Sequence, residues 1–462
     1  MADDKPKDKP PTSRLGRLAR LAALAPKGVP IALEGAKRAL GMRKPEETTD
    51  EARKKMAEDA KKAAEALLKT LGEMKGLPLK VGQMVSYVDG LAPPGYEERF
   101  KAELKKLQDK APPLSAEAAV KVVTAELGAP PHEVFAEWED EPFAAASIGQ
   151  VHRATTKDGA KVAVKVQYPG IDKAIEADLK SLSFFHGMIS PIAKKLHSQQ
   201  TLDEISQVFR DELDYGREAQ MADVFRRIHQ GDPRVIIPRV HHSLTTKRVL
   251  TTDLLGGAAY ADFVKSGSQE SKNLAGETLW RFTFRALLKH GHLYADPHPG
   301  NYRFYDDGTV GFLDFGCIKV LPPELVGGMK RYMGAAMDAD WHEFDRACVE
   351  VLGYDPEDES WDLYRSYTLQ LLMPIMTKEP WVCSTESARE AVQYISRGMR
   401  KLMFKEGEIP QLPKVPKMPQ DFTFVNRLQW GLASVLAGLG TVASFRTIME
   451  DWVKDGVHPI PD

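Results

Sequence analysis

The stretch that decides the fold is Tyr294-Ala-Asp-Pro-His-Pro-Gly-Asn301, followed closely by Leu313-Asp-Phe-Gly316. Asp296 and Asn301 are five residues apart, and Asp314 follows thirteen residues after Asn301. Carboxylate and amide oxygens are the hard ligands that Mg²⁺ prefers, with water and phosphate oxygens completing its shell. A second carboxylate nearby can orient or deprotonate a hydroxyl group or a water molecule. The stretch therefore predicts a magnesium–phosphate site in which Asn301 and Asp314 hold the metal and Asp296 acts on the nucleophile.

This spacing is similar to that of the catalytic loop and the Asp-Phe-Gly turn of protein kinases, which also require a lysine on an upstream strand. Lys161–Gln167 alternates with the period of a strand and contains Val162-Ala-Val-Lys165. We predict that Lys165 neutralises the α- and β-phosphates; the alternative is a solvent-facing strand lysine. A turn at Lys157–Gly159 favours a hairpin with the preceding strand.

The loop before this hairpin departs from the glycine-rich pattern of ordinary kinases. It reads Phe143-Ala-Ala-Ala-Ser-Ile-Gly-Gln150, and alanine does not reach positive φ as cheaply as glycine. We therefore expect that the loop is not the usual backbone cradle for phosphates, and that only Gly149 keeps the freedom of glycine. A plain strand-entry segment remains the alternative.

These departures identify a family. The motifs Lys80-Val-Gly-Gln83, Ala144-Ala-Ala-Ser147, Glu212-Leu-Asp214 and Tyr294–Asn301 resemble those of the ABC1/AarF/UbiB family of atypical kinases, over roughly residues 66–444. The resemblance implies that Lys80 and Gln83 lie on helices covering the active site, where Glu212 and Asp214 engage Lys80 and shape the metal–nucleotide site. It also implies that Glu218 is the helix glutamate that pairs with Lys165. The residues that we expect to be catalytic are Lys80, Lys165, Glu218 and Asp296, and those that we expect to bind the nucleotide are Gln83, Ala144, Ala145, Ala146, Ser147, Lys165, Glu212 and Asp214. From the residues alone, Lys80 and the acids could equally be solvated helix positions.

The expected fold is α+β: a kinase-like bilobal fold with a small β-rich N-lobe, a large helical C-lobe and an N-terminal helical extension that covers the active site. We expect a disordered and basic amphipathic segment over 1–50, the extension over 51–130, the N-lobe with a helical insertion over 131–257 and the C-lobe over 258–462. Glu212, Asp214 and Glu218 are expected in one helical stretch. Glu324 comes only ten residues after Asp314, too soon for the activation segment that builds a peptide platform.

These features favour an enzyme that uses ATP and Mg²⁺, with water or a small hydroxylated molecule as acceptor. The resemblance implies a role in isoprenoid-quinone (ubiquinone) biosynthesis, through ATP hydrolysis or small-molecule phosphorylation. The alternatives are a nucleotide-gated regulatory scaffold with little turnover and, less favoured because of the short segment after Asp314, a conventional protein kinase.

Composition narrows the partners and the compartment. The formal net charge is −2 with an isoelectric point near 6.7, so we expect no nucleic-acid partner. The three cysteines, Cys317, Cys348 and Cys383, show no metal or disulfide spacing and suggest a reducing compartment. The uncharged run Trp430–Phe445 is short and interrupted by glycine, so we predict a buried C-lobe helix and no transmembrane span. We expect a cytoplasmic protein that can lie at the inner face of a membrane, with membrane lipid or quinone-pathway proteins as further partners. The helix Arg14–Leu24 could touch lipid, but a solvated linker helix is the interpretation that we prefer.

Overall fold

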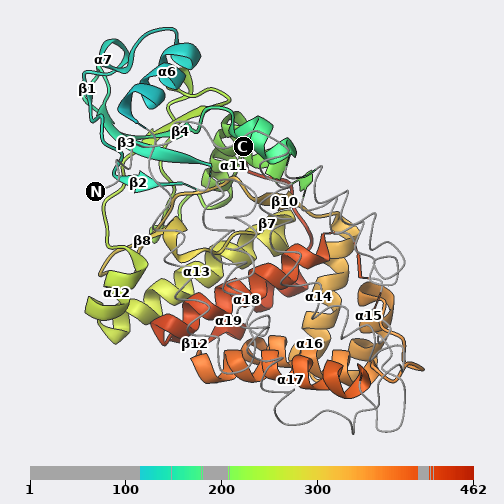
Figure 1. Ribbon diagram of the computed structural model, residues 1–462. Helices are drawn as coiled ribbons and strands as arrows, with labels where there is room; N and C mark the ends of the chain where they lie inside the picture. The colour runs from blue at the N-terminus through green and yellow to red at the C-terminus, as the bar shows by residue number, and fades with distance from the viewer. Residues whose placement is uncertain are drawn as a thin grey trace, which may run out of the picture.

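A computed structural model describes residues 115–146, 148–177, 179, 206–207, 209–403, 416, 418–419 and 421–461. The predicted N-terminal segment, the Lys80-Val-Gly-Gln83 motif and Ser147 lie outside these residues. Within them the chain forms a small lobe built on a sheet and a larger helical lobe, as Figure 1 shows. The α+β bilobal architecture is therefore confirmed.

The small lobe is a five-stranded antiparallel sheet with the order β1-β3-β4-β6, in which β2 also pairs with β3. Its strands are β1 (Glu137–Trp138), β2 (Ala144–Ala145), β3 (Gly149–Thr155), β4 (Lys161–Gln167) and β6 (Val249–Asp253). The β3–β4 hairpin turns at Gly159, whose φ of +87° suits glycine, as the sequence predicts. Helices α6 (Ala116–Leu127) and α7 (Pro131–Val134) precede the sheet, and Val122 and Val123 of α6 share a buried core with the β4 valines.

Helix α11 (Tyr215–Ile228) links the two lobes. Asp214 begins it, because its Oδ1 accepts hydrogen bonds from the backbone N–H groups of Gly216 at 3.0 Å and Arg217 at 3.3 Å. The expectation of one helical stretch over Glu212, Asp214 and Glu218 is wrong. A preceding helix ends at Glu212, Leu213 lies in a turn, and α11 starts at Tyr215. The break places Glu212 and Glu218 on different helices.

The large lobe consists mostly of helices, with a few short strands among them. Its helices are α12 (Tyr260–Ser266), α13 (Gln269–His290), α14 (Pro323–Met337), α15 (Trp341–Leu352), α16 (Trp361–Met376), α17 (Thr385–Met403), α18 (Phe422–Leu439) and α19 (Phe445–Lys454). A three-stranded sheet has the order β5-β9-β8 and consists of β5 (Val235–Ile236), β8 (Tyr302–Phe304) and β9 (Val310–Phe312). Two strand pairs are formed by β7 (His292–Tyr294) with β10 (Ile318–Val320) and by β11 (Trp381–Val382) with β12 (Val442–Ala443).

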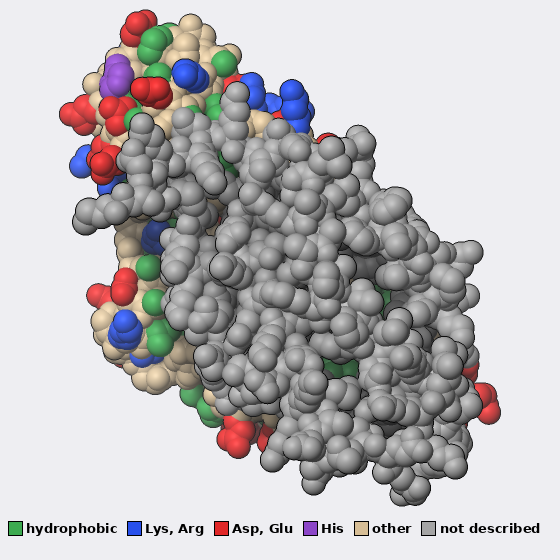
Figure 2. Space-filling model, viewed as in Figure 1, with side chains coloured by type: hydrophobic (Ala, Val, Ile, Leu, Met, Phe, Trp, Pro, Cys, Tyr) green, Lys and Arg blue, Asp and Glu red, His purple; other side chains and the backbone are tan. Residues whose placement is uncertain are grey.

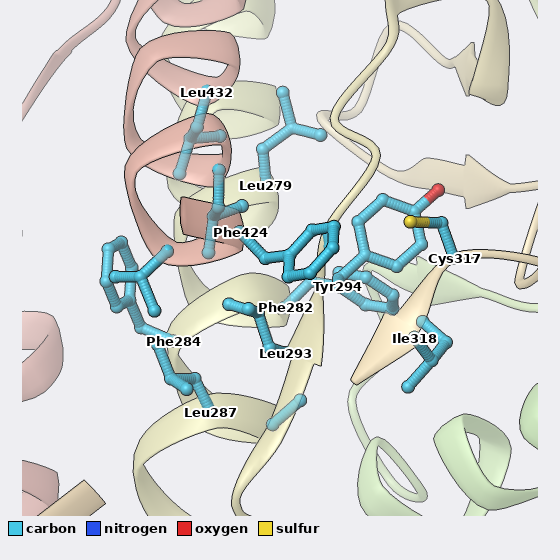
Figure 3. Packing of buried hydrophobic residues seen from close by; sticks show 14 of the residues in the cluster. Leu279, Phe282, Phe284, Leu287, Leu293, Tyr294, Cys317, Ile318, Phe424 and Leu432 are labelled. Atoms are coloured by element: carbon cyan, nitrogen blue, oxygen red, sulfur yellow. The ribbon is translucent and has the colours of Figure 1, made fainter. Parts of the chain in front are cut away.

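Helix α13 forms the centre of this lobe. Ser268 caps its first turn by accepting from the N–H of Ser271, and Gly291 ends it with a φ of +68°. Buried side chains of α13 such as Leu279, Phe282 and Phe284 pack against β7 and against Phe424 and Leu432 of α18, as Figure 3 shows. This continuous core fixes β7, and with it the segment that carries Asp296, to α18.

The first part of the uncharged run near the C-terminus, Trp430–Leu439, lies in a largely buried helix as expected, whereas the rest forms a turn and β12 and reaches the start of α19. Helix α18 ends at Gly440, whose φ is +62°, and most of its apolar positions are buried. In the part of the chain that is described, no helix has the length and apolar character that crossing a bilayer requires. On the face shown in Figure 2, the described N-lobe surface carries acidic and basic side chains interspersed.

Candidate active site

The strand lysine and the helix glutamate meet between the lobes. Lys165 Nζ lies 3.0 Å and 3.1 Å from the two carboxylate oxygens of Glu218, although the two residues are fifty-three positions apart. The same ammonium lies 3.2 Å from Asp314 Oδ2. The side chains of Glu218 and Lys165 are only 4% and 16% exposed. One cation therefore joins β4, α11 and the Asp-Phe-Gly turn in a largely dry environment.

The protonation state of this cluster follows from burial and charge. Burial disfavours the ammonium, but the carboxylates of Asp314 and Glu218 raise the pKa of Lys165 well above its ordinary value. Burial raises the pKa of Glu218 to about 7, against the opposing charge of Lys165. The raised pKa of Lys165 favours its charged form, whereas the raised pKa of Glu218 favours its neutral form. Because the ammonium contacts three carboxylate oxygens, we describe Lys165 as charged and Glu218 as its ionised partner above pH 7.

Asp314 stabilises the Asp-Phe-Gly turn and also binds Lys165. Its Oδ1 accepts from the N–H of Gly316 at 3.0 Å, and its Oδ2 contacts Lys165. A carboxylate has about four lone-pair positions, so both oxygens can still bind a cation. A Cβ added to Gly316 would lie 3.8 Å from Cγ of Glu212, so the buried Glu212 stands directly beside this turn.

The catalytic-loop segment is organised around Asp296. Asn301 Nδ2 donates to the backbone oxygen of Asp296 at 3.1 Å and to Asp296 Oδ2 at 3.3 Å. The other carboxylate oxygen, Oδ1, accepts from Arg427 Nη2 of α18 at 2.6 Å. Asp296 and Arg427 are 20% and 18% exposed, so this ion pair is only weakly screened by solvent. Both Asp296 oxygens therefore have fixed directions.

Arg427 is the main residue of the candidate site that the sequence analysis did not find. Burial works against its charge, but Asp296 and Cys317 raise its pKa, so it remains a guanidinium. Its Nη1 lies 4.0 Å from Sγ of Cys317, the buried residue that directly follows the Asp-Phe-Gly turn. No local pattern around Arg427 signals this contact. Tyr215, whose ring lies 4.9 Å from Lys165 Nζ, was also missed, although it directly follows the Glu212-Leu-Asp214 motif.

Most of the predicted residues that the structure describes line a common cleft of about 260 Å³ between the lobes. Its alanine-rich roof is a tight hairpin, in which the Ala146 N–H donates to the Gly149 carbonyl at 2.9 Å. Gly149 serves close packing, because a Cβ there would lie 2.3 Å from the backbone oxygen of Val166. The cleft is lined by Ala144, Ala145, Ala146, Val151, Ala163, Lys165, Leu250, Thr252, Asp253, Leu255, Asp296, His298, Asn301, Arg303, Leu313 and Asp314, among others.

Three of the described predicted residues do not line the cleft: Glu218, which contacts Lys165 from α11, together with Asp214 and Glu212. Asp214 serves as the N-cap of α11 and does not line the cleft, whereas Glu212 lies behind the Asp-Phe-Gly turn. Lys80, Gln83 and Ser147 stay predictions, since they lie outside the described residues. Among the residues that are described, no group of three or more His, Cys, Asp or Glu side chains converges as a metal site. A cation held by Asp314 and Asn301 would need oxygens from a bound phosphate as well.

A small sheet lobe over a helical lobe, a lysine–glutamate pair and a catalytic-loop Asp/Asn segment facing an Asp-Phe-Gly turn define a kinase-like protein. The chain belongs to the family described as the ABC1 atypical kinase-like domain, whose model matches residues 106–347. This family membership confirms the resemblance that the sequence motifs indicated.

Named relatives support the same family. The chain is 33% identical over 359 residues to a chloroplastic aarF domain-containing protein kinase of Arabidopsis thaliana, covering 77% of this chain and 47% of that protein. It is 34% identical over 280 residues to the mitochondrial atypical kinase COQ8B of Rattus norvegicus, covering 60% and 52%. A probable protein kinase UbiB of Marinobacter nauticus is 32% identical, with coverage of 62% and 53%. The chain thus spans about half the length of these curated relatives.

A solved structure has the same fold. The Mycobacterium tuberculosis protein Rv3197, determined in complex with erythromycin, superposes with a TM-score of 0.61 at 27% identity. The match covers 87% of this chain and 98% of that one.

Proposed function

We propose that this protein binds ATP with Mg²⁺ in the interlobe cleft and cleaves the γ-phosphate, with water or a small hydroxylated molecule as acceptor. The observation that carries this proposal is the convergence of Lys165, Glu218 and Asp314 on one side of the cleft with Asn301 and Asp296 on the other. The apolar walls from Val151, Ala163, Leu250 and Leu313 suit a planar base.

The residues divide the work as follows. Lys165 neutralises phosphate charge, and Glu218 holds its ammonium in place from a buried position. Asp314 and Asn301 would hold Mg²⁺, which when bound neutralises charge on the transferred phosphate. Asp296 orients the attacking hydroxyl group, and Arg427 keeps its carboxylate in one direction.

The segment after Asp314 supports a small acceptor. Strand β10 begins at Ile318 and pairs at once with β7, and α14 follows from Pro323. This leaves no long segment to build a peptide platform, which argues against phosphorylation of proteins. The resemblance of the sequence motifs to the ABC1/AarF/UbiB family, to which the names of the relatives COQ8B and UbiB also point, extends the proposal to isoprenoid-quinone (ubiquinone) metabolism, at or near a membrane surface.

A second candidate is a nucleotide-gated scaffold with little turnover. The observation that favours it is that Arg427 and Asn301 both contact Asp296 and hold its carboxylate in an ion pair and a hydrogen bond. An alanine-rich roof in place of glycine also reduces the backbone donors available to the phosphates.

The deciding experiment is Mg·ATP hydrolysis by the purified chain, with and without anionic liposomes, and with Asp296→Asn and Asp314→Asn. Turnover abolished by both substitutions supports the enzyme, and stimulation by liposomes supports a lipid-surface substrate. Nucleotide binding without turnover in every condition supports the scaffold. Unchanged Mg·ATP affinity in Asp314→Asn would overturn the assignment of the metal ligand.

A further inference from the structure

A second cleft, here called the basic cleft, lies where the end of α11 meets α13 and α19. It is open to solvent and has a volume of about 690 Å³, which is within the range of small-molecule sites. None of the residues that line it lines the interlobe cleft. It is therefore a separate place on the molecule, and an inference about it does not depend on the proposed nucleotide chemistry.

The lining of the basic cleft carries an excess of positive charge. Arg281, Arg285 and Lys289 follow one another at a spacing of four residues, so they share one face of α13. Arg234 lines the cleft from the loop before β5. Of the described residues that line the cleft, only Asp232 is acidic. Four cationic side chains therefore face a single carboxylate.

The two arginines are held in place by the buried Asp232. Its Oδ2 accepts from Arg281 Nε at 2.8 Å and lies 3.0 Å from Arg285 Nη1, and its Oδ1 accepts from Arg281 Nη2 at 3.2 Å. The Asp232 side chain is 4% exposed, whereas Arg281 and Arg285 are 21% and 22% exposed. A guanidinium carries more N–H donors than these contacts use, so both arginines can bind a second anion from fixed positions.

Asp232 does not need two arginines to balance its charge. Burial opposes the ionised form of this carboxyl, but the neighbouring guanidinium groups lower its pKa, so it carries one negative charge. Burial also lowers the pKa of Arg285 against the attraction of Asp232, and the charge of Arg281 lowers it further. A second anion in the basic cleft would relieve this repulsion between the arginines.

An aromatic wall completes the basic cleft. The ring of Trp452 on α19 lies 5.7 Å from Cζ of Arg285 and packs against the C-lobe core. His290 Nδ1 donates to the backbone oxygens of His458 at 3.2 Å and Pro459 at 3.0 Å, which fixes the segment beside the cleft. The cleft therefore offers a rigid apolar surface next to its cations.

We propose that the basic cleft binds a soluble small molecule that carries a phosphate or pyrophosphate group. The phosphate oxygens accept from Arg281, Arg285 and Lys289, because guanidinium groups match the geometry of phosphate and form short, charge-assisted hydrogen bonds with it. The remainder of the molecule lies against Trp452. A lipid headgroup has the same chemistry, but the arginines are recessed in a concave site that a small anion can enter and a flat bilayer cannot.

The test uses the full chain with ¹⁵N-labelled tryptophan indoles, observed by NMR in phosphate-free buffer at constant ionic strength. Inorganic pyrophosphate is the probe, and the Trp452 signal is assigned by its loss in Trp452→Phe. Trp341, which is 41% exposed and lines neither cleft, supplies the reference signal. Arg285→Gln and Lys289→Gln each remove one positive charge from the basic cleft. Lys265→Gln is the matched control, because it removes the same charge from an exposed position on α12.

Pyrophosphate is expected to shift the Trp452 signal saturably while the Trp341 signal stays in place. Both substitutions in the basic cleft should weaken binding at least about fivefold, and Lys265→Gln should change it less than about twofold. Lys289 makes no ion pair with the described residues, so Lys289→Gln reports on the anion even if Arg285→Gln disturbs Asp232. An unsaturable shift, an equal shift of Trp341, or an affinity that Lys289→Gln leaves unchanged would overturn the proposal.

A membrane arm distinguishes the two sources of phosphate. Phosphatidylcholine vesicles with and without phosphatidic acid present the same chemical group on a bilayer, and co-sedimentation measures binding of the chain to them. Pyrophosphate binding that Lys289→Gln weakens, with vesicle binding that the same substitution leaves unchanged, is the expected result. Vesicle binding that depends on Lys289, without any binding of pyrophosphate, would overturn the proposal of a soluble ligand.

Discussion

The central contact of the candidate active site can be tested through stability alone. Lys165 lies 3.0 Å from Glu218 and 3.2 Å from Asp314, and Glu218 is 4% exposed. At an effective dielectric constant near 20, each contact corresponds to about 5 kcal/mol of attraction before desolvation is subtracted. Breaking a buried pair by removing one partner typically costs about 3–5 kcal/mol. We expect Lys165→Met to lower the free energy of unfolding by about that amount in the absence of nucleotide.

The loss arises mainly from the charge left behind, so a second substitution should recover it. Glu218→Gln keeps the shape of the side chain and removes its charge. In the Lys165→Met background it is expected to restore at least about 2 kcal/mol, because neighbouring charges that share a partner are strongly coupled. The four proteins of this cycle would be compared by urea unfolding at pH 8, where Glu218 is ionised in the wild type.

The pH dependence supplies a second readout. Burial already raises the pKa of Glu218 to about 7 beside the lysine, and removing the lysine raises it further. The folded variant then holds a proton that the unfolded chain releases, so its stability falls as the pH rises. The expected decrease is up to about 2 kcal/mol between pH 7 and pH 8.5, at about 1.4 kcal/mol per unit. Additive single and double substitutions, or a variant whose stability is flat over this range, would refute the ion-pair reasoning.

Other substitutions test separate features. Burial lowers the pKa of His229 to about 3, so the unfolded chain binds the extra proton below pH 6.5 and stability falls as the solution is acidified. We expect His229→Phe to remove about 2 kcal/mol of the loss between pH 7 and pH 5 in urea titrations, and an unchanged slope would argue against a buried neutral imidazole. Gly149→Ala, whose Cβ would meet a backbone oxygen at 2.3 Å, should cost about 1–3 kcal/mol, whereas Gly327→Ala in α14, with open space around it, should stabilise by about 0.5–1 kcal/mol. Equal effects of the two alanines would contradict the packing argument. Arg427→Met should lower ATP turnover at least about tenfold while nucleotide affinity stays within about threefold. The reason is that Arg427 contacts Asp296 and does not line the cleft. A loss of nucleotide affinity proportional to the loss of turnover would place the arginine at the nucleotide instead.

The sequence predicts those parts of the site that depend on local patterns better than those that depend on contacts between distant residues. The strand with Lys165 and the turn at Gly159 follow from local alternation and turn chemistry, and both are found as predicted. Pairing of Lys165 with Glu218 spans fifty-three residues and came from the family resemblance, since charge placement on a helix alone is compatible with solvent. The capping role of Asp214 has a local signature, an acid directly before a helix, whereas the family resemblance predicts a nucleotide-binding role for the same residue.

Two other features had no local signature. Arg427 reaches Asp296 across 131 residues of sequence, and only the packing of α18 against β7 brings them together. Gly149 was expected to supply conformational freedom, but it is needed for the close approach of Val166 and has no positive φ. Both depend on how elements pack in three dimensions, which neither periodicity nor composition encodes.

The charges of the two clusters also explain why nucleotide and metal should bind together. Lys165, Glu218 and Asp314 leave one excess negative charge, whereas Asp296 and Arg427 neutralise one another. A nucleotide without a metal would bring further negative charge to the side of the cleft that already holds this excess. A divalent cation reverses the sign there, and Asp314 is the carboxylate that faces both the lysine and the cleft. We therefore expect chelation of Mg²⁺ to abolish nucleotide binding itself, and not only turnover, as measured by a fluorescent nucleotide titrated with and without EDTA.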